Sequence, residues 1–411
     1  MIGADPTPPL RGERHDMTAC AAMTSKTNAA KGVSVARLKL SEFRNYARLD
    51  LPLDSGGGPV VLTGPNGAGK TNLLEAVSLL APGRGLRGAA LPEIGRHGAA
   101  TPWAVHARLA TPDGPVELGT GLQTDGDGPP RRRVRIDGET AGSPAALGRY
   151  VKLLWLTPAM DRLFMEGGTE RRRFLDRIVL TLHGDHGRQV AAFERAMRER
   201  NRLLAEYGTA ADAAWLAALE GRMAEAAVAV AAARRETVAQ LDACARRGAS
   251  PAFPQAAVSV SGWLEDGLAA QSALDVEDSY RDALRAQRPR DAAAGRSLVG
   301  PHRSDLEVLH LGKAMPAAQC STGEQKALLI ALVLAHADLT LAVTGGAPAL
   351  LLDEIVAHLD AERRLALFDA LAPLGGQSWL TGTDPALFAG LADRAQAFHI
   401  EDGRVTASRL V

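Results

Sequence analysis

Residues 64–71 read Gly-Pro-Asn-Gly-Ala-Gly-Lys-Thr and fit the pattern G-x-x-x-x-G-K-[ST], which restricts the fold of this chain more than any other stretch. An apolar run at 59–63 predicts a buried strand before the motif, and residues 72–77 predict a helix after it. In this setting the glycines let backbone N–H groups surround a triphosphate, which disfavours the alternative of a chance glycine-rich turn. The predicted nucleotide-binding residues are Gly64, Pro65, Asn66, Gly67, Ala68, Gly69, Lys70 and Thr71.

The chemistry of this loop lies in its last two residues. Lys70 is expected to reach the β- and γ-phosphates of ATP, and the Thr71 hydroxyl is expected to bind Mg²⁺. The N-terminus of the following helix adds positive potential at the same place. ATP and Mg²⁺ are therefore the predicted ligands.

A second motif supplies acidic groups. Residues 349–354, Ala-Leu-Leu-Leu-Asp-Glu, predict an apolar strand that ends in two carboxylates. Asp353 is suited to hold Mg²⁺, and Glu354 to orient or deprotonate the attacking water. A buried strand that happens to end in a solvated acidic turn is the alternative, and the presence of the phosphate loop makes it the weaker one. Lys70, Asp353 and Glu354 are the predicted catalytic residues.

The overall composition limits the partners of the chain. Its 411 residues suffice for two or three domains, or for one domain with a large insertion, and carry a formal net charge of zero. A nucleic-acid surface must therefore be a local patch. The three cysteines are scattered without a C-x-x-C pair, which fits a reducing cytoplasm and disfavours disulfides or a zinc site.

Four parts are expected along the chain. Residues 1–33 predict a disordered tail, because they combine several prolines and charges without an apolar core. Residues 34–156 predict the first part of an ATPase lobe, with short antiparallel strands. The Ala-, Arg-, Glu- and Leu-rich segment 157–295 predicts a helical arm built on two long amphipathic helices. Residues 296–411 return to strands and helices. We expect no membrane contact, since the longest apolar run is too short to span a bilayer.

A turn of small residues precedes a predicted helix at 327–339. Such a turn at a helix N-terminus is a second anion site, unless it is an ordinary capped helix. It cannot easily serve the nucleotide that Lys70 already encloses, but it could serve the nucleotide of a second copy of the chain. The residues of this signature turn are Ser321, Thr322, Gly323, Glu324 and Gln325.

The order of phosphate loop, signature turn and acidic strand resembles that of the ABC-type ATPases, in which one subunit's signature closes on the γ-phosphate held by the other. Asp360 resembles the D-loop residue of that superfamily. Thr381 and Thr383 lie where a switch histidine is usual. The resemblance implies an α/β fold: an ABC-type P-loop ATPase head, with a mixed sheet and helices, that carries an inserted α-helical arm.

Further motifs are similar to one branch, the RecF family of bacterial recombinational-repair ATPases related to the SMC proteins. Residues 40–46, Leu-Ser-Glu-Phe-Arg-Asn-Tyr, resemble its "FRNY" element, and Arg44 and Asn45 are accordingly expected at the nucleotide. Residues 171–176, Arg-Arg-Arg-Phe-Leu-Asp, resemble its "RRxFLD" element. Residues 300–306 resemble its "GPHRDDL" element, and Ser304 stands where aspartate is usual. The signature departs from the common "SxGQ" form, because Glu324 precedes Gln325.

The resemblance implies a function as well as a fold. It implies a weak, DNA-stimulated ATPase that dimerises on ATP and binds single-stranded or gapped DNA in the cytoplasm. It also implies cooperation with RecR and RecO in loading RecA during recombinational repair and replication restart. An ATPase subunit of a membrane transporter and a module that binds ATP without hydrolysing it are the alternatives.

Local arginine clusters are the candidate DNA contacts. Arg131, Arg132 and Arg133 lie near a predicted sheet turn, and Arg171 opens the helical arm. Each could neutralise a phosphate, although a solvated face or an internal ion-pair network is the alternative for any one cluster.

Overall fold

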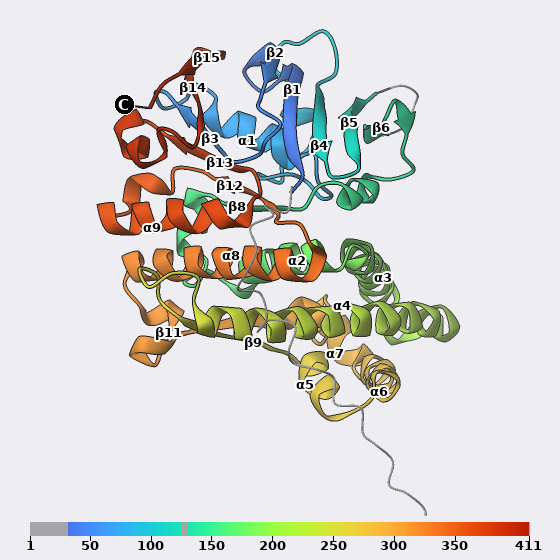
Figure 1. Cartoon of the computed structure of the whole chain (residues 1–411). Coiled ribbons are helices and arrows are strands. Elements are labelled where there is room, and N and C mark those ends of the chain that lie inside the picture. The colour runs from blue at the N-terminus through green and yellow to red at the C-terminus, as the bar shows by residue number, and fades with distance from the viewer. Residues whose placement is uncertain (1–31, 125–127, 129, 411) are drawn as a thin grey trace, which may run out of the picture.

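The computed structural model of the chain describes residues 32–124, 128 and 130–410, so almost all of the predicted tail at 1–33 lies outside the described residues. Two six-stranded sheets, one three-stranded sheet and several helices form layers (Figure 1). The α-helices are α1 (Lys70–Ser78), α2 (Gly168–Leu182), α3 (His186–Tyr207), α4 (Ala213–Arg247), α5 (Trp263–Ala270), α6 (Ala273–Ala286), α7 (Arg288–Ala294), α8 (Thr322–Thr344) and α9 (Ala361–Leu371).

The central sheet holds both nucleotide motifs. Its strand order is β15-β14-β3-β13-β12-β8, and every neighbouring pair is parallel except β14 with β15. The strands are β3 (Pro59–Thr63), β8 (Leu153–Leu156), β12 (Ala349–Leu352), β13 (Ser378–Gly382), β14 (Gln396–Glu401) and β15 (Arg404–Ser408). The phosphate loop follows β3 and the acidic pair follows β12. Because the two strands are parallel in one sheet, both motifs lie at the same edge.

Alternating residues of the central sheet face two different cores. Val60 and Leu62 of β3 face a core that α1 and the second sheet complete. Val61 and Leu350 face a core that contains α8 and α9. Both faces of the strands are therefore covered, which explains why they read as continuous apolar runs rather than as alternating ones.

The second sheet is antiparallel, in the order β2-β1-β4-β5-β6-β7. Its strands confirm the short strands predicted in the first lobe. They are β1 (Ser34–Phe43), β2 (Tyr46–Pro52), β4 (Ala104–Thr111), β5 (Gly114–Gln123), β6 (Arg131–Ile136) and β7 (Glu139–Thr140).

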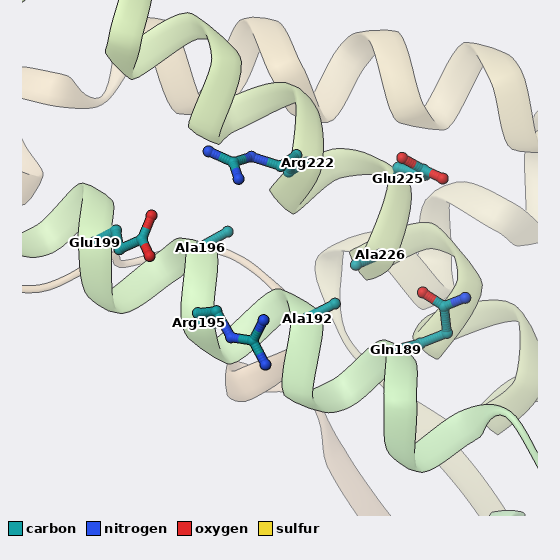
Figure 2. Close-up of a pocket in the computed structure, with 8 residues that line it drawn as sticks. All are labelled: Gln189, Ala192, Arg195, Ala196, Glu199, Arg222, Glu225 and Ala226. Atoms are coloured by element: carbon teal, nitrogen blue, oxygen red, sulfur yellow. The ribbon is translucent and has the colours of Figure 1, made fainter. Parts of the chain in front are cut away.

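Helices α3 and α4 form the long arm. The turn at Gly208–Ala210 joins them, and they pack side by side with α6 around a third apolar core (Figure 1). Alanines on both helices allow close approach, and charged side chains line the groove between them (Figure 2). The predicted pair of long helices is confirmed, whereas the four-part division of the chain stays a prediction.

Helix α8 lies between α4 and the central sheet and is apolar on all sides (Figure 1). By length and composition it could cross a membrane, contrary to our expectation from the length of its apolar run. However, 72% of its most apolar window is buried inside the structure, as in the core helix of a soluble protein. A small sheet of β9 (Ala256–Ser261), β10 (Asp305–His310) and β11 (Met315–Pro316) packs nearby.

Candidate functional site

Three glycines shape the phosphate loop, each with a positive φ. Gly64 has a φ of +145°, and a β-carbon there would lie 2.1 Å from the carbonyl oxygen of Ile400. Gly69 has a φ of +118°, and its β-carbon would lie 2.6 Å from the Tyr46 hydroxyl. Gly67, at +82°, faces open space. Positive φ favours glycine at all three positions, and close neighbours exclude any side chain at two of them.

Lys70 reaches back across the loop from the first turn of α1. Its Nζ donates hydrogen bonds to the carbonyl oxygens of Gly64 at 2.8 Å and Pro65 at 3.1 Å. The same ammonium lies 3.3 Å from the Glu354 carboxylate, and only 5% of the lysine side chain is exposed. The predicted catalytic lysine and glutamate are therefore brought together across two strands of the sheet.

Asp353 lies at the centre of the site. Its carboxylate accepts hydrogen bonds from the Thr71 hydroxyl at 3.0 Å and from the Thr381 hydroxyl at 2.8 Å. Burial raises the pKa of Asp353, and these two hydrogen bonds oppose that rise. A carboxylate beside a threonine hydroxyl is a set of hard oxygen donors that fits Mg²⁺, so Thr71 and Asp353 are suited to hold the metal.

Glu354 has an unusual backbone. Its φ is +54°, a conformation that non-glycine residues rarely adopt. Its N–H donates to the Thr381 hydroxyl at 2.9 Å, and its side chain remains 24% exposed. Backbone strain of this kind costs about 1–3 kcal/mol and gathers at functional sites. The strained conformation turns the carboxylate toward Lys70, where the phosphates are expected.

The "FRNY" segment supports the loop from outside. The Asn45 amide donates to the Ala68 carbonyl at 3.0 Å, and the Tyr46 hydroxyl donates to the Gly69 carbonyl at 3.1 Å. Arg44 pairs with the buried carboxylate of Glu75. These contacts explain the motif as a brace for the loop. Direct nucleotide contact by Arg44 and Asn45 stays a prediction.

Sequence reasoning missed three residues around this brace. Glu75, in α1, is almost fully buried and also pairs with Arg87 at 2.6 Å. Tyr46 is buried and its pKa is raised by burial, so its hydroxyl stays protonated and able to donate. A glutamate in an otherwise apolar stretch of α1 was the available signal, because a buried carboxylate requires a cationic partner.

The signature turn forms a capped helix start. Ser321 is the N-cap of α8, and its backbone N–H donates to the Glu324 carboxylate at 2.9 Å. Ser321, Thr322 and Gly323 are exposed. Gln325 instead points inward, where its amide donates to the Cys320 carbonyl at 2.8 Å. The exposed part of the predicted signature is therefore the stretch 321–323.

The predicted D-loop and switch residues have separate positions. Asp360 caps α9 by accepting from the Arg363 N–H at 2.8 Å. Thr381 is fully buried against Asp353, whereas Thr383 is exposed. Thr381 is thus a support for the acidic pair, and a role of Asp360 or Thr383 at a second copy stays a prediction.

Two of the four arginines predicted to contact DNA are engaged inside the chain. Arg132 is largely buried: it donates to the Gly83 carbonyl at 2.6 Å and to the Leu79 carbonyl, and burial lowers its pKa to about 10. Arg171 forms a bidentate ion pair with Asp305, in which Nε and Nη2 donate to the two carboxylate oxygens at 2.7 and 2.6 Å. Because these guanidinium groups already have partners inside the chain, they are weaker candidates for phosphate contact than Arg131 and Arg133, and DNA contact by any of the four stays a prediction.

The arm gives no simple basic face either. In the groove between α3 and α4, two arginines lie among two glutamates (Figure 2). Arg131 is exposed and Arg133 is partly exposed, and both stay predicted DNA contacts.

Comparison with known proteins gives close relatives. The family model described as the RecF/RecN/SMC N terminal domain matches residues 34–381. The "DNA replication and repair protein RecF" of Rhizobium johnstonii is 54% identical over 375 residues, covering 91% of this chain and 98% of that protein. The protein of the same name from Allorhizobium ampelinum is 52% identical over 378 residues, covering 92% and 100%. These names favour DNA repair over the transporter alternative.

Solved structures share the fold. The recombination mediator protein RecF-ATPrS of the RecFOR pathway superimposes with a TM-score of 0.80 at 20% identity, covering 92% of this chain and 98% of that one. The Smc head domain of Pyrococcus furiosus, bound to the C-terminal domain of ScpA, matches with a TM-score of 0.51 at 16% identity, covering 92% and 97%. The predicted fold, an α/β ATPase head with a helical arm, is confirmed.

Proposed function

The chain belongs to the RecF family of DNA replication and repair proteins, and we propose that it acts there as a nucleotide-gated, DNA-binding ATPase. ATP bridges two copies, the paired copies hold DNA, and slow hydrolysis releases it. One observation carries this proposal: the phosphate loop with Lys70, beside the candidate metal donors Thr71 and Asp353, coexists with an exposed signature turn at Ser321.

The residues of the site suggest how hydrolysis proceeds. Lys70 exchanges its two carbonyl partners for phosphate oxygens, and the N–H groups of the loop surround the same phosphates. Mg²⁺, when bound, neutralises charge that develops on the phosphates. Thr71 and Asp353 supply its protein ligands, and Thr381 keeps Asp353 oriented. Glu354 orients or deprotonates the attacking water from its strained position.

Dimerisation follows from the exposed signature turn. The hydrogen bonds of residues 321–325 and those of the phosphate loop involve separate residues within the described part of the chain. A second copy can place its turn on the triphosphate held by the first. A ligand contacted by both copies stabilises their complex by linkage, so ATP occupancy controls assembly.

DNA and protein partners complete the proposal. We place the protein in the cytoplasm, on single-stranded or gapped DNA, with RecR and RecO as partners in loading RecA. The name of the solved relative refers to the RecFOR pathway, which supports this assignment. The exposed Arg131 and the partly exposed Arg133 are the stronger candidates for phosphate contact.

Light scattering at micromolar protein tests the proposal. We expect the wild-type mass to double when ATP and Mg²⁺ are added. Lys70→Ala should stay monomeric because it loses phosphate binding, and Glu354→Gln should remain dimeric because it binds without hydrolysing. Lys39→Ala, which removes an equally positive charge from the exposed face of β1, is the control. An unchanged wild-type mass would refute the gated dimer.

Binding to a gapped duplex, compared with intact duplex and single strands across a salt series, tests the DNA role. Affinity should require ATP and fall as salt rises, because phosphate contacts release counterions. Equal DNA affinity with and without ATP would refute the proposal that the nucleotide controls DNA binding.

A further inference from the structure

A charged pair lies beside the exposed signature turn. The Lys313 ammonium forms an ion pair with the Glu324 carboxylate, and the two side chains are 49% and 25% exposed. The other oxygen of Glu324 accepts a hydrogen bond from the Ser321 N–H at 2.9 Å. The carboxylate is therefore held from two sides, by a cation and by the backbone of the signature serine.

The position of Glu324 creates an electrostatic conflict. Under the proposed function, this helix start receives the γ-phosphate of a second copy, and a carboxylate three residues from the signature serine repels that anion. Two like charges a few ångströms apart at a partly buried interface disfavour association strongly. A compensating cation must therefore lie close to the carboxylate.

Lys313 is built into the fold at that place. It ends a short turn, Leu311–Lys313, whose Leu311 N–H donates to the Gln255 carbonyl at 3.1 Å. The next residue, Ala314, has a φ of +49°, and the chain then enters β11. The backbone that carries the lysine is thus anchored to the small sheet, next to the start of α8.

The same carboxylate engages the serine as well as the lysine. The Ser321 N–H donates to Glu324 at 2.9 Å, and the Ser321 side chain also stabilises the charged carboxylate. Ser321 itself lies exposed at the start of α8. The pKa of Glu324 is lowered to about 2 by Lys313 first and by Ser321 next, so the carboxylate stays ionised and bound to both partners at neutral pH.

We propose that Lys313 is a positioning residue of the signature site. It neutralises Glu324 and keeps that carboxylate on the Ser321 N–H, so that the exposed signature turn can receive the γ-phosphate of the second copy. This inference rests on the proposed ATP-bridged dimer. Lys313 acts through Glu324 and Ser321 and makes no contact with the reacting atoms.

A double-mutant cycle on Lys313 and Glu324 tests the proposal. We compare the wild type with Lys313→Ala, Glu324→Gln and the double variant, and Lys39→Ala is the control because that exposed lysine also pairs with a carboxylate. The dissociation constant of the dimer is measured by sedimentation with ATP and Mg²⁺. Binding of a fluorescent ATP analogue at low protein concentration reports on the phosphate loop of the monomer.

Lys313→Ala should weaken the ATP-bound dimer about tenfold, because each interface then carries an uncompensated carboxylate. Glu324→Gln keeps a capping acceptor without the charge, so this variant and the double variant should dimerise like the wild type. Analogue binding by the monomer should be unchanged in all variants. A merely structural lysine would not be rescued by Glu324→Gln.

Different results would refute the role of Lys313 and the proposed ATP-bridged dimer. A wild type that dimerises with ATP, together with Lys313→Ala that matches Lys39→Ala, would overturn the role of Lys313 alone. A double variant as weak as Lys313→Ala would overturn it too. A wild type that stays monomeric with ATP would remove the proposed function and this inference with it.

Discussion

Thr381 offers a sharp test of how the acidic pair is held. Its hydroxyl donates to Asp353 at 2.8 Å and accepts from the Glu354 N–H at 2.9 Å, and the residue is fully buried. Thr381→Val keeps the shape of the side chain and removes both hydrogen bonds. The variant therefore leaves little cavity, and its effect reports on the hydroxyl.

The expected size of the effect follows from these two bonds. A hydrogen bond to a charged group contributes about 1.5–3 kcal/mol, and a buried N–H without a partner costs about 1–3 kcal/mol. We expect Thr381→Val to lower the free energy of unfolding by about 2.5–6 kcal/mol. Loss of a residue that orients a metal ligand typically costs about 10- to 100-fold in metal affinity or activity, so hydrolysis should fall in that range.

The pH dependence of hydrolysis has a definite sign. Burial raises the pKa of Asp353, and the hydrogen bond from Thr381 is the larger of the two that lower it. Removing that bond raises the pKa further, so the carboxylate becomes protonated at higher pH. The acid limb of the rate profile should therefore move toward higher pH in Thr381→Val.

Phosphate release is measured against Mg²⁺ concentration and pH, and stability is measured by urea unfolding. Thr381→Ser keeps the hydroxyl and should retain the wild-type Mg²⁺ dependence, although it loses about 1 kcal/mol of stability with its methyl group. Thr383→Val is the exposed control. If Thr381→Val matches Thr383→Val in Mg²⁺ dependence and in the acid limb, the assigned role of the hydroxyl is refuted.

Three further changes have expected outcomes. Gly64→Ala should abolish ATP-induced thermal stabilisation in scanning fluorimetry, because the new methyl group overlaps a backbone carbonyl of β14, whereas Gly56→Ala meets open space and should be silent. His336 is fully buried with a pKa lowered to about 3 by burial, so the unfolded chain binds a proton that the folded chain refuses as pH falls below 6.5. Unfolding free energy should then drop by about 1.4 kcal/mol per pH unit, and His336→Leu should show a shallower slope in urea titrations at pH 7 and 5. Arg200→Met leaves the buried carboxylate of Asp291 without its cation, although Glu220 keeps Arg288, and should cost about 3–5 kcal/mol in urea unfolding, whereas Arg198→Met on the exposed face should change stability by less than about 0.5 kcal/mol.

The nucleotide site was predictable from the sequence because its parts are local. Residues 59–71 and 349–354 each combine an apolar strand with a chemical motif, and parallel pairing brings such strand ends to one edge. The neighbours of β3 in the sheet were not predictable. Strand β3 pairs with β13 and β14, which come from the far end of the chain, and the sequence pattern of a strand does not identify its partner.

The arginine clusters show which internal contacts the sequence reasoning did not include. In β6, Val134 is buried, and the two-residue period of a strand puts Arg132 on the same face, so its burial was available from the pattern. The partner of Arg171 was not available, because Asp305 lies 134 positions away. The bond from Thr381 to Asp353 was likewise not available from the sequence, because it crosses between neighbouring strands.

The threading of the central sheet has a consequence for protein synthesis. Thr63, at the end of β3, bonds to Phe398 of β14, 335 positions further along the chain. A ribosome adding about 5–20 residues per second needs on the order of tens of seconds to make the intervening segment. During most of that time β3 lacks both of its sheet neighbours, β13 and β14, while the helical hairpin of α3 and α4 can already fold. The nascent chain therefore cannot complete its ATP-binding site until translation is almost finished.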